Sequence, residues 1–161
     1  MIETLEWHPV SGSSITLNDL NYPLSSFEPE VDREDKQYKK WVAHGEWPSF
    51  SYAGAMRIPA EGRILATGAD DTARATDYVT KRLALCDAFL PSATTPLTSR
   101  PHGYLRIKLY GMAEAADADG HIISFRAPMQ ALYPSNSEFF VTFKLFTPYF
   151  TGASTTVYPI G

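Results

Sequence analysis

Residues able to do chemistry are spread along this chain of 161 residues without forming a motif. The four histidines include no pair at the helical spacing that presents two zinc ligands on one face; they are His8, His44, His102 and His121. Cys86 falls within an apolar helical pattern, which disfavours a reactive thiolate. No Gly-x-Ser-x-Gly elbow or glycine-rich phosphate loop is present. We therefore expect no catalytic, cofactor-binding or metal-binding residues.

Three weaker patterns bear on binding or catalysis. Asp117-Ala118-Asp119-Gly120 resembles the start of a calcium loop, but the third acid and the distal glutamate are missing. Scattered glutamates offer no identifiable acid and base pair for a glycosidase. Three tryptophans suit either a sugar-stacking platform or the core and interface positions more usual for this residue; they are Trp7, Trp41 and Trp47. A carbohydrate-binding β-sandwich therefore remains the alternative function.

Composition excludes several classes of protein. An aromatic content of 13% with 12 prolines and 10 glycines indicates short strands joined by turns. The formal net charge of −4 and scattered basic residues argue against nucleic-acid binding. No apolar run reaches the roughly 18 residues that a membrane helix requires. A single cysteine and an acidic start predict synthesis in a cytoplasm, without a disulfide or a signal peptide.

The hydrophobic pattern predicts antiparallel strands interrupted by one helix. We expect hairpins at residues 2–7 with 14–17 and at 49–58 with 63–67, the second turning at Pro59–Gly62. Further strands are expected at 104–110 and 121–133, with a turn at 112–120 between them. Asp70 and Asp71 open a helix over about residues 70–90. Its apolar stripe is Ala75, Val79, Leu83, Cys86 and Leu90, widened by Tyr78, Leu85 and Phe89.

The final long strand, residues 138–147, is apolar on both faces. Side chains alternate along a strand, so Phe139, Val141, Phe143 and Leu145 share the core face. The other face carries Phe140 and Phe146 beside a threonine and a lysine. This second face needs a partial cover, either the helix of the same chain or a neighbouring subunit.

These elements predict a mainly β fold, a sandwich of antiparallel strands with one flanking helix. We expect one domain over residues 1–161, with an extended arm at about 28–45 and a C-terminal tail at 151–161. Both segments are poor in core residues and are expected to reach neighbouring chains. The tail also keeps strand-forming side chains. The predicted interface residues are therefore Phe140 and Phe146 on the second face of the long strand, and Thr155, Thr156, Val157 and Tyr158 in the tail.

The order of the motifs resembles the N-terminal ring domain of siphophage distal tail proteins. The resemblance covers nearly the whole chain, and each motif alone is weak. The motifs are Ile15–Asp19 with Tyr22-Pro23, His44-Gly45, Tyr52–Arg57, Gly62–Leu65, the helix at 70–90, Arg100–Ile107, and Phe139–Phe150 with its Pro-Tyr-Phe ending.

The resemblance implies a structural virion protein at the phage tail tip. It implies a homo-oligomeric, sixfold ring that contacts the tail tube protein and the hub or tip proteins, with the tape measure protein passing through its channel. The family has no catalytic residues to transfer to this chain. Larger members carry a further carbohydrate-binding domain, which is missing from this sequence, so direct sugar recognition is not expected. Another tail ring protein, of the tube or terminator type, remains an alternative.

Overall fold

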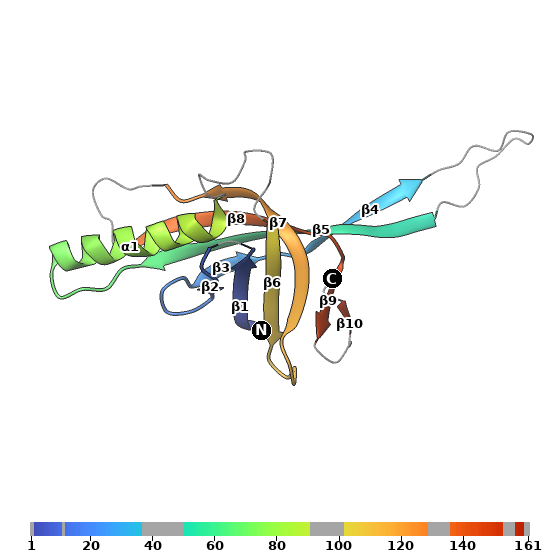
Figure 1. The fold of residues 1–161 in the computed structure, drawn as a ribbon, viewed down its shortest axis with the longest axis horizontal. Helices are drawn as coiled ribbons and strands as arrows, with labels where there is room; N and C mark the ends of the chain where they lie inside the picture. The colour runs from blue at the N-terminus through green and yellow to red at the C-terminus, as the bar shows by residue number, and fades with distance from the viewer. Residues whose placement is uncertain are drawn as a thin grey trace, which may run out of the picture.

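The computed structural model describes residues 2–10, 12–36, 50–90, 102–128, 136–152 and 157–159 (Figure 1). Every strand pairing in this part of the chain is antiparallel. The elements are β1 (Ile2–Pro9), β2 (Ile15–Leu17), β3 (Leu24–Phe27), β4 (Glu30–Lys36), β5 (Phe50–Leu65), α1 (Asp71–Phe89), β6 (His102–Leu109), β7 (Ala116–Arg126), β8 (Asn136–Leu145), β9 (Tyr149–Gly152) and β10 (Val157–Pro159).

The strands form one continuous sheet that folds over on itself. Its main order is β2-β1-β6-β7-β8-β5-β3, with β4 added to β5, β9 to β7 and β10 to β9. Strand β7 pairs with β6 over residues 116–121 and with β8 over residues 120–126, and its register with β8 shifts between Ile122 and Ser124. As a result β1, β6 and β7 cross the direction of β5 and β8 (Figure 1). The predicted mainly β, sandwich-like fold with one helix is confirmed.

The core lies where the two halves of the sheet meet. Trp7 of β1 is fully buried, and its ring lies 5.5 Å from that of Phe143 on β8. Its indole Nε1 donates a hydrogen bond of 3.0 Å to the carbonyl of Ala88 in α1. This one side chain therefore joins both halves of the sheet to the helix.

Helix α1 begins and ends close to the predicted positions, but it buries a different face. The Asp70 carboxylate accepts a hydrogen bond of 2.7 Å from the amide of Ala73, which is an N-cap. The buried residues of α1 are Tyr78, Leu85, Ala88 and Phe89. The predicted central stripe is wrong, because Val79 and Leu83 are 48% and 58% exposed. The neighbouring stripe carries the larger rings, and these fill the space over β8.

Two predicted turns are also corrected. Residues 50–65 form the single strand β5, which passes through Pro59 without turning. A proline has no backbone amide to donate to a neighbouring strand, and this position does not require one. The Pro59 carbonyl accepts a 3.2 Å hydrogen bond from the Glu28 amide. Within the same strand Gly62 leaves room for the Phe139 ring, since an added Cβ would lie 2.6 Å from it. Strand β7 begins at residue 116, so the predicted turn at 112–120 is shorter than expected. Residues 129–133 of the strand predicted at 121–133 lie outside the described part.

The other predicted elements are confirmed. β1 and β2 form the first hairpin, with Trp7 opposite Ile15. In β6 the side chains of Leu105 and Ile107 are buried, as the alternation predicts. Among the described residues, no helix combines the length and apolar character of a membrane span.

Candidate assembly surfaces

An arm made of two strands extends from the body at the end opposite α1 (Figure 1). We define the arm as residues 30–36 of β4 with residues 50–55 of β5. The pairing runs from Glu30 opposite Arg57 to Lys36 opposite Phe50. Within the described part, residues 50–55 pair with β4 alone, whereas from Met56 onward β5 also pairs with β8. Residues 37–45 of the predicted arm lie outside the described residues.

Strand β8 has the two-faced character that its sequence predicts. Phe139, Val141, Phe143 and Leu145 are each at most 1% exposed. Helix α1 packs on this core face, because Phe89 contacts Phe143 with ring centroids 6.0 Å apart. The helix therefore covers the core face of β8, and Phe140 and Phe146 belong to the other face.

The two predicted interface phenylalanines of β8 and its end have different surroundings. Phe140 is partly buried, and the Arg126 guanidinium lies 5.7 Å from its ring centroid. Phe146 is 52% exposed and packs against the rings of His102 and His121 at 6.0 and 5.5 Å. Both side chains leave part of their apolar surface on the outer face of the sheet, as the sequence predicts; what covers them stays a prediction.

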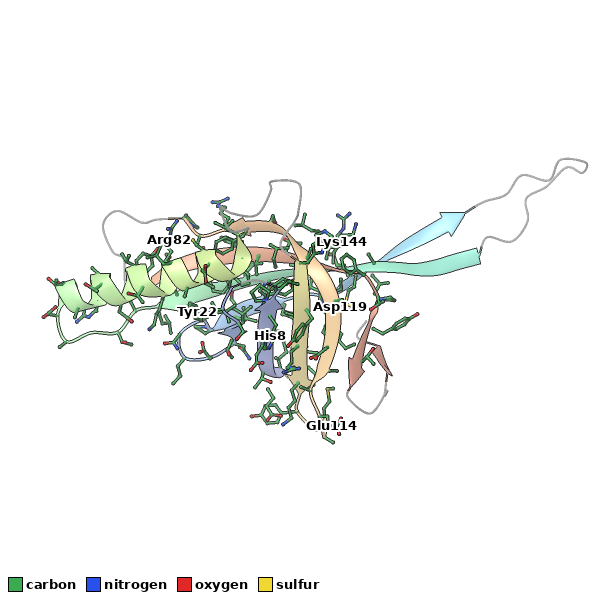
Figure 2. The ribbon with its side chains drawn as sticks, in the orientation of Figure 1. His8, Tyr22, Arg82, Glu114, Asp119 and Lys144 are labelled. Carbon is green, nitrogen blue, oxygen red and sulfur yellow. The ribbon has the colours of Figure 1, made fainter. Side chains whose placement is uncertain are left out.

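A row of basic side chains crosses this outer face. Arg57 of β5 lies opposite Lys144 of β8, Lys144 opposite His121 of β7, and His121 opposite His102 of β6. Directly opposed residues of antiparallel strands point to the same face. Figure 2 labels Lys144 where β7 passes β8. We name Arg57, Lys144, His121, His102 and Phe146 the sheet patch.

The histidine pair within this patch was missed from the sequence, where His102 and His121 are 19 positions apart. The β6–β7 hairpin brings their ring centroids to 6.0 Å. Its turn includes Gly111 at φ 91°, a conformation that glycine adopts without strain. A turn placed at Gly111, in place of the longer loop predicted, would have put the two histidines in register.

Beside the sheet patch, strands β1, β6 and β7 form a shallow groove of about 300 Å³. Its lining includes His8, which stacks on Tyr104 with centroids 4.5 Å apart, together with His102, Asp119 and Phe146. Gly103 and Gly120 contribute no side chains to it. At Gly103 an added Cβ would collide with the His8 carbonyl oxygen, so the close approach of β1 and β6 requires glycine.

The predicted C-terminal interface lies only partly within the described residues. Val157 and Tyr158 belong to β10, which pairs with β9 of the same chain through Val157 opposite Thr151 and Tyr158 opposite Phe150. Thr155 and Thr156 lie outside the described residues. One side of β10 is thus used within the chain, while contact of the tail with a neighbouring chain stays a prediction.

Polar pairs on the surface stabilise the sheet and the helix start. Arg106 donates two hydrogen bonds of 2.8 Å to the Asp117 carboxylate, and these bonds raise the pKa of the guanidinium further. Asp77 of α1 accepts from Lys81 Nζ at 2.8 Å and from the Thr67 amide at 2.7 Å. The Lys81 hydrogen bond is the main cause of the lowered pKa of Asp77.

Within the described part of the chain, the residues considered for chemistry do not assemble into a site. Asp117 and Asp119 lie in β7, so the calcium-loop pattern is part of a strand. Trp7 is fully buried and cannot stack on a sugar, while Trp41 and Trp47 lie outside the described residues. No group of three or more His, Cys, Asp or Glu side chains suited to a metal ion occurs in the described ranges.

Comparisons with known proteins give only distant likenesses. No family model and no curated protein matches the sequence. Among solved structures, the chain is similar to one from the tail of an empty GTA particle with C6 symmetry, at TM-score 0.46 and 10% identity over 98% of this chain and 95% of that one.

A second likeness is to a chain of the phage p2 baseplate in its activated conformation, at TM-score 0.40 and 8% identity over 89% and 43% of the two chains. A third is to a chain of a native gene transfer agent virion, at TM-score 0.36 and 11% identity over 76% and 78%. At these values the likenesses carry no argument about function.

Proposed function

We propose that this chain is a structural subunit of a phage tail, which closes into a hexameric ring at the distal end of the tail tube. Its partners are further copies of itself, the tail tube protein, the hub or tip proteins and the tape measure protein. It resides in the virion at the tail tip and catalyses no reaction. The ordered motifs shared with distal tail proteins motivate this proposal.

The arm is the observation that carries the proposal. A two-stranded ribbon without further strands is at best marginally stable in water. Residues 50–55 have no other described strand beside them, and the arm extends away from the core (Figure 1). A second surface, supplied by a neighbouring subunit, accounts for a ribbon of this kind.

Closure of a ring requires two different and complementary surfaces on each subunit. The arm supplies one at one end of the molecule. We assign the predicted interface residues to further contacts: Phe140 and Phe146 on the outer face of the sheet, and Thr155, Thr156, Val157 and Tyr158 along the C-terminal tail. Tyr149 and Phe150 of the Pro-Tyr-Phe segment begin β9, which pairs with β10 of that tail.

Shortening the arm tests the proposal. Arg33 and Ala53 are directly paired, so an Asn-Gly turn replacing residues 34–52 closes the hairpin without disturbing the body. We expect hexamers of the full chain by native mass spectrometry, and folded monomers of the shortened chain. Circular dichroism spectra of the two proteins should agree in shape. Equal assembly of both would contradict the role of the arm.

Particles distinguish the distal ring from other tail rings. Gold-labelled antibody against the chain should mark the tail tip in electron micrographs. Label along the whole tail would instead indicate a tube subunit, and label at the junction with the head would indicate a terminator. Intact particles without any label would reject a tail component altogether.

A further inference from the structure

The sheet divides into two limbs where β8 ends. Up to that point β8 lies between β7 and β5, and its last residue, Leu145, lies opposite Met56. Beyond it the chain continues along the same side of β7 as β9, because β6 occupies the other side of residues 116–121. Strand β5 does not follow, and its residues 50–55 leave the body with β4 as the arm.

Strand β10 takes the place beside β9 that β5 holds beside β8. β9 pairs with β7 on one side, through Thr151 opposite Asp117, so β10 lies on its other side. One limb of the sheet therefore ends in β10, and the arm forms the other limb. Figure 1 shows the two limbs diverging, with the arm directed to the right and β9 and β10 directed downward.

Each limb has a strand edge that pairs with nothing in the described part of the chain. Residues 50–55 of β5 pair with β4 on one edge, and β8 ends before it reaches their other edge. β10 pairs with β9 alone. An unpaired edge presents a row of backbone amides and carbonyls, which makes it a template for another strand.

These two edges lack the charged residues with which proteins protect an edge from pairing. Strand β4, which forms the opposite edge of the arm, has six charged residues among its seven. Residues 50–55 of β5 and residues 157–159 of β10 include no charged residue. The sequence therefore protects the β4 edge and leaves the other two edges open to pairing.

The divergence of the limbs directs β10 away from the outer part of its own arm (Figure 1). Successive copies can bring the two edges together. A head-to-tail contact requires two different surfaces on each subunit, and one edge on each limb meets this requirement. Each copy then uses its arm edge with one neighbour and its β10 edge with the other, and the relation repeats around a ring.

We propose that residues 50–55 of β5 in one copy pair through main-chain hydrogen bonds with β10 of the next copy. A second copy of this chain is the partner because the chain itself carries both edges, unpaired, uncharged and separated by the same division of the sheet. The inference rests on the proposed ring and specifies which strands join its subunits. The arm of one subunit and the tail of the next thus meet in a single contact.

Pairs of cysteines in the full chain test this contact, in a Cys86→Ser background that removes the single native thiol. Ser51→Cys and Tyr52→Cys occupy neighbouring positions of the arm edge, so the two variants sample both faces of the strand. Each is combined with Val157→Cys in β10. Mild oxidation of the ring, isolated or in particles, should give a ladder of disulfide-linked oligomers that ends at the hexamer.

The matched control moves the arm cysteine to the protected edge. Asp35 and Glu34 lie directly opposite Ser51 and Tyr52 in the arm. Asp35→Cys and Glu34→Cys stand one strand further from the proposed partner, beyond the reach of a disulfide. Combined with Val157→Cys, they should give about tenfold less cross-linked product, because only paired edges hold two thiols at a high effective concentration. Equal cross-linking from both edges would overturn the inference.

Mixtures of single-cysteine proteins identify the partner. Protein with Ser51→Cys or Tyr52→Cys alone, mixed with protein with Val157→Cys alone, should give covalent heterodimers. Cross-linked monomers of the double variants, with no product in the mixture, would show β10 pairing with its own arm and overturn the inference. Homodimers of one single-cysteine protein as the main product would overturn it in favour of arm-to-arm or tail-to-tail pairing.

Native mass spectrometry separates this inference from the proposed function. Wild-type hexamers, together with no cross-linking by either cysteine pair, would leave the ring intact and overturn the strand pairing. A wild-type chain that forms no ring, alone or in particles, would overturn both.

Discussion

The docking of α1 on β8 predicts a strong coupling between two buried hydroxyl groups. Tyr78 Oη and Ser137 Oγ lie 2.6 Å apart, and the two residues are 2% and 0% exposed. Removing one hydroxyl leaves the other buried without this partner, which costs about 1–3 kcal/mol in the free energy of unfolding. Tyr78→Phe and Ser137→Ala should each be destabilising by that amount.

The double variant is the informative protein. Once both hydroxyls are removed, no buried polar group is left without its partner, so the loss should be smaller than the sum of the single losses by about 1 kcal/mol or more. Urea unfolding followed by tryptophan fluorescence measures all four proteins of the cycle. With a slope of about 2 kcal/mol per molar urea, each single substitution should lower the midpoint by about 0.5–1.5 M.

Tyr110→Phe is the matched control, because Tyr110 is 69% exposed and the same hydroxyl is removed. Its free energy of unfolding should stay within about 0.5 kcal/mol of the wild type. Strictly additive losses in the cycle would refute the reasoning, since Tyr78 and Ser137 would then not be partners.

Three further predictions concern the sheet and the ionisable groups. Gly103→Ala should lower the unfolding free energy by about 1–3 kcal/mol in urea titrations, because the new methyl meets the His8 carbonyl; wild-type stability would contradict that close approach. Asp77→Asn should lower the melting temperature more at pH 7 than at pH 2. The lowered pKa of Asp77 makes its contribution present above the ordinary carboxyl pKa and lost as the pH falls through the lowered pKa, and an equal loss at both pH values would exclude the charge as its source. Burial raises the pKa of Tyr22 to about 12, so ultraviolet titration should find this phenol ionising late and stability should fall between pH 10 and 12; ionisation of all tyrosines near pH 10 would be contrary evidence.

Local signals in the sequence were sufficient for several elements. The Asp70 cap positions the start of the helix, and alternation along β8 identifies Phe139 and Phe143 as core residues. These signals act over a few residues, because the helix start and the face of a strand depend on neighbouring side chains and backbone amides. The turn predicted at Pro59–Gly62 is wrong because proline and glycine favour turns only where the segment does not pair with a neighbouring strand.

The choice between the two apolar stripes of α1 could not be made from the helix alone. Both stripes have helical spacing, and either is able to face a core. Tyr78 and Phe89 face inward because they reach Ser137 and Phe143, residues far away in the sequence. Val79 and Leu83 consequently lie outside.

The sequence by itself determined the mainly antiparallel fold, the position of the helix and the two-faced character of β8, because each follows from periodicity within one segment. Tertiary structure alone decided that His102 meets His121, that Arg57 meets Lys144, and which face of α1 remains available. These depend on strand register and on packing between distant segments, which no local pattern encodes.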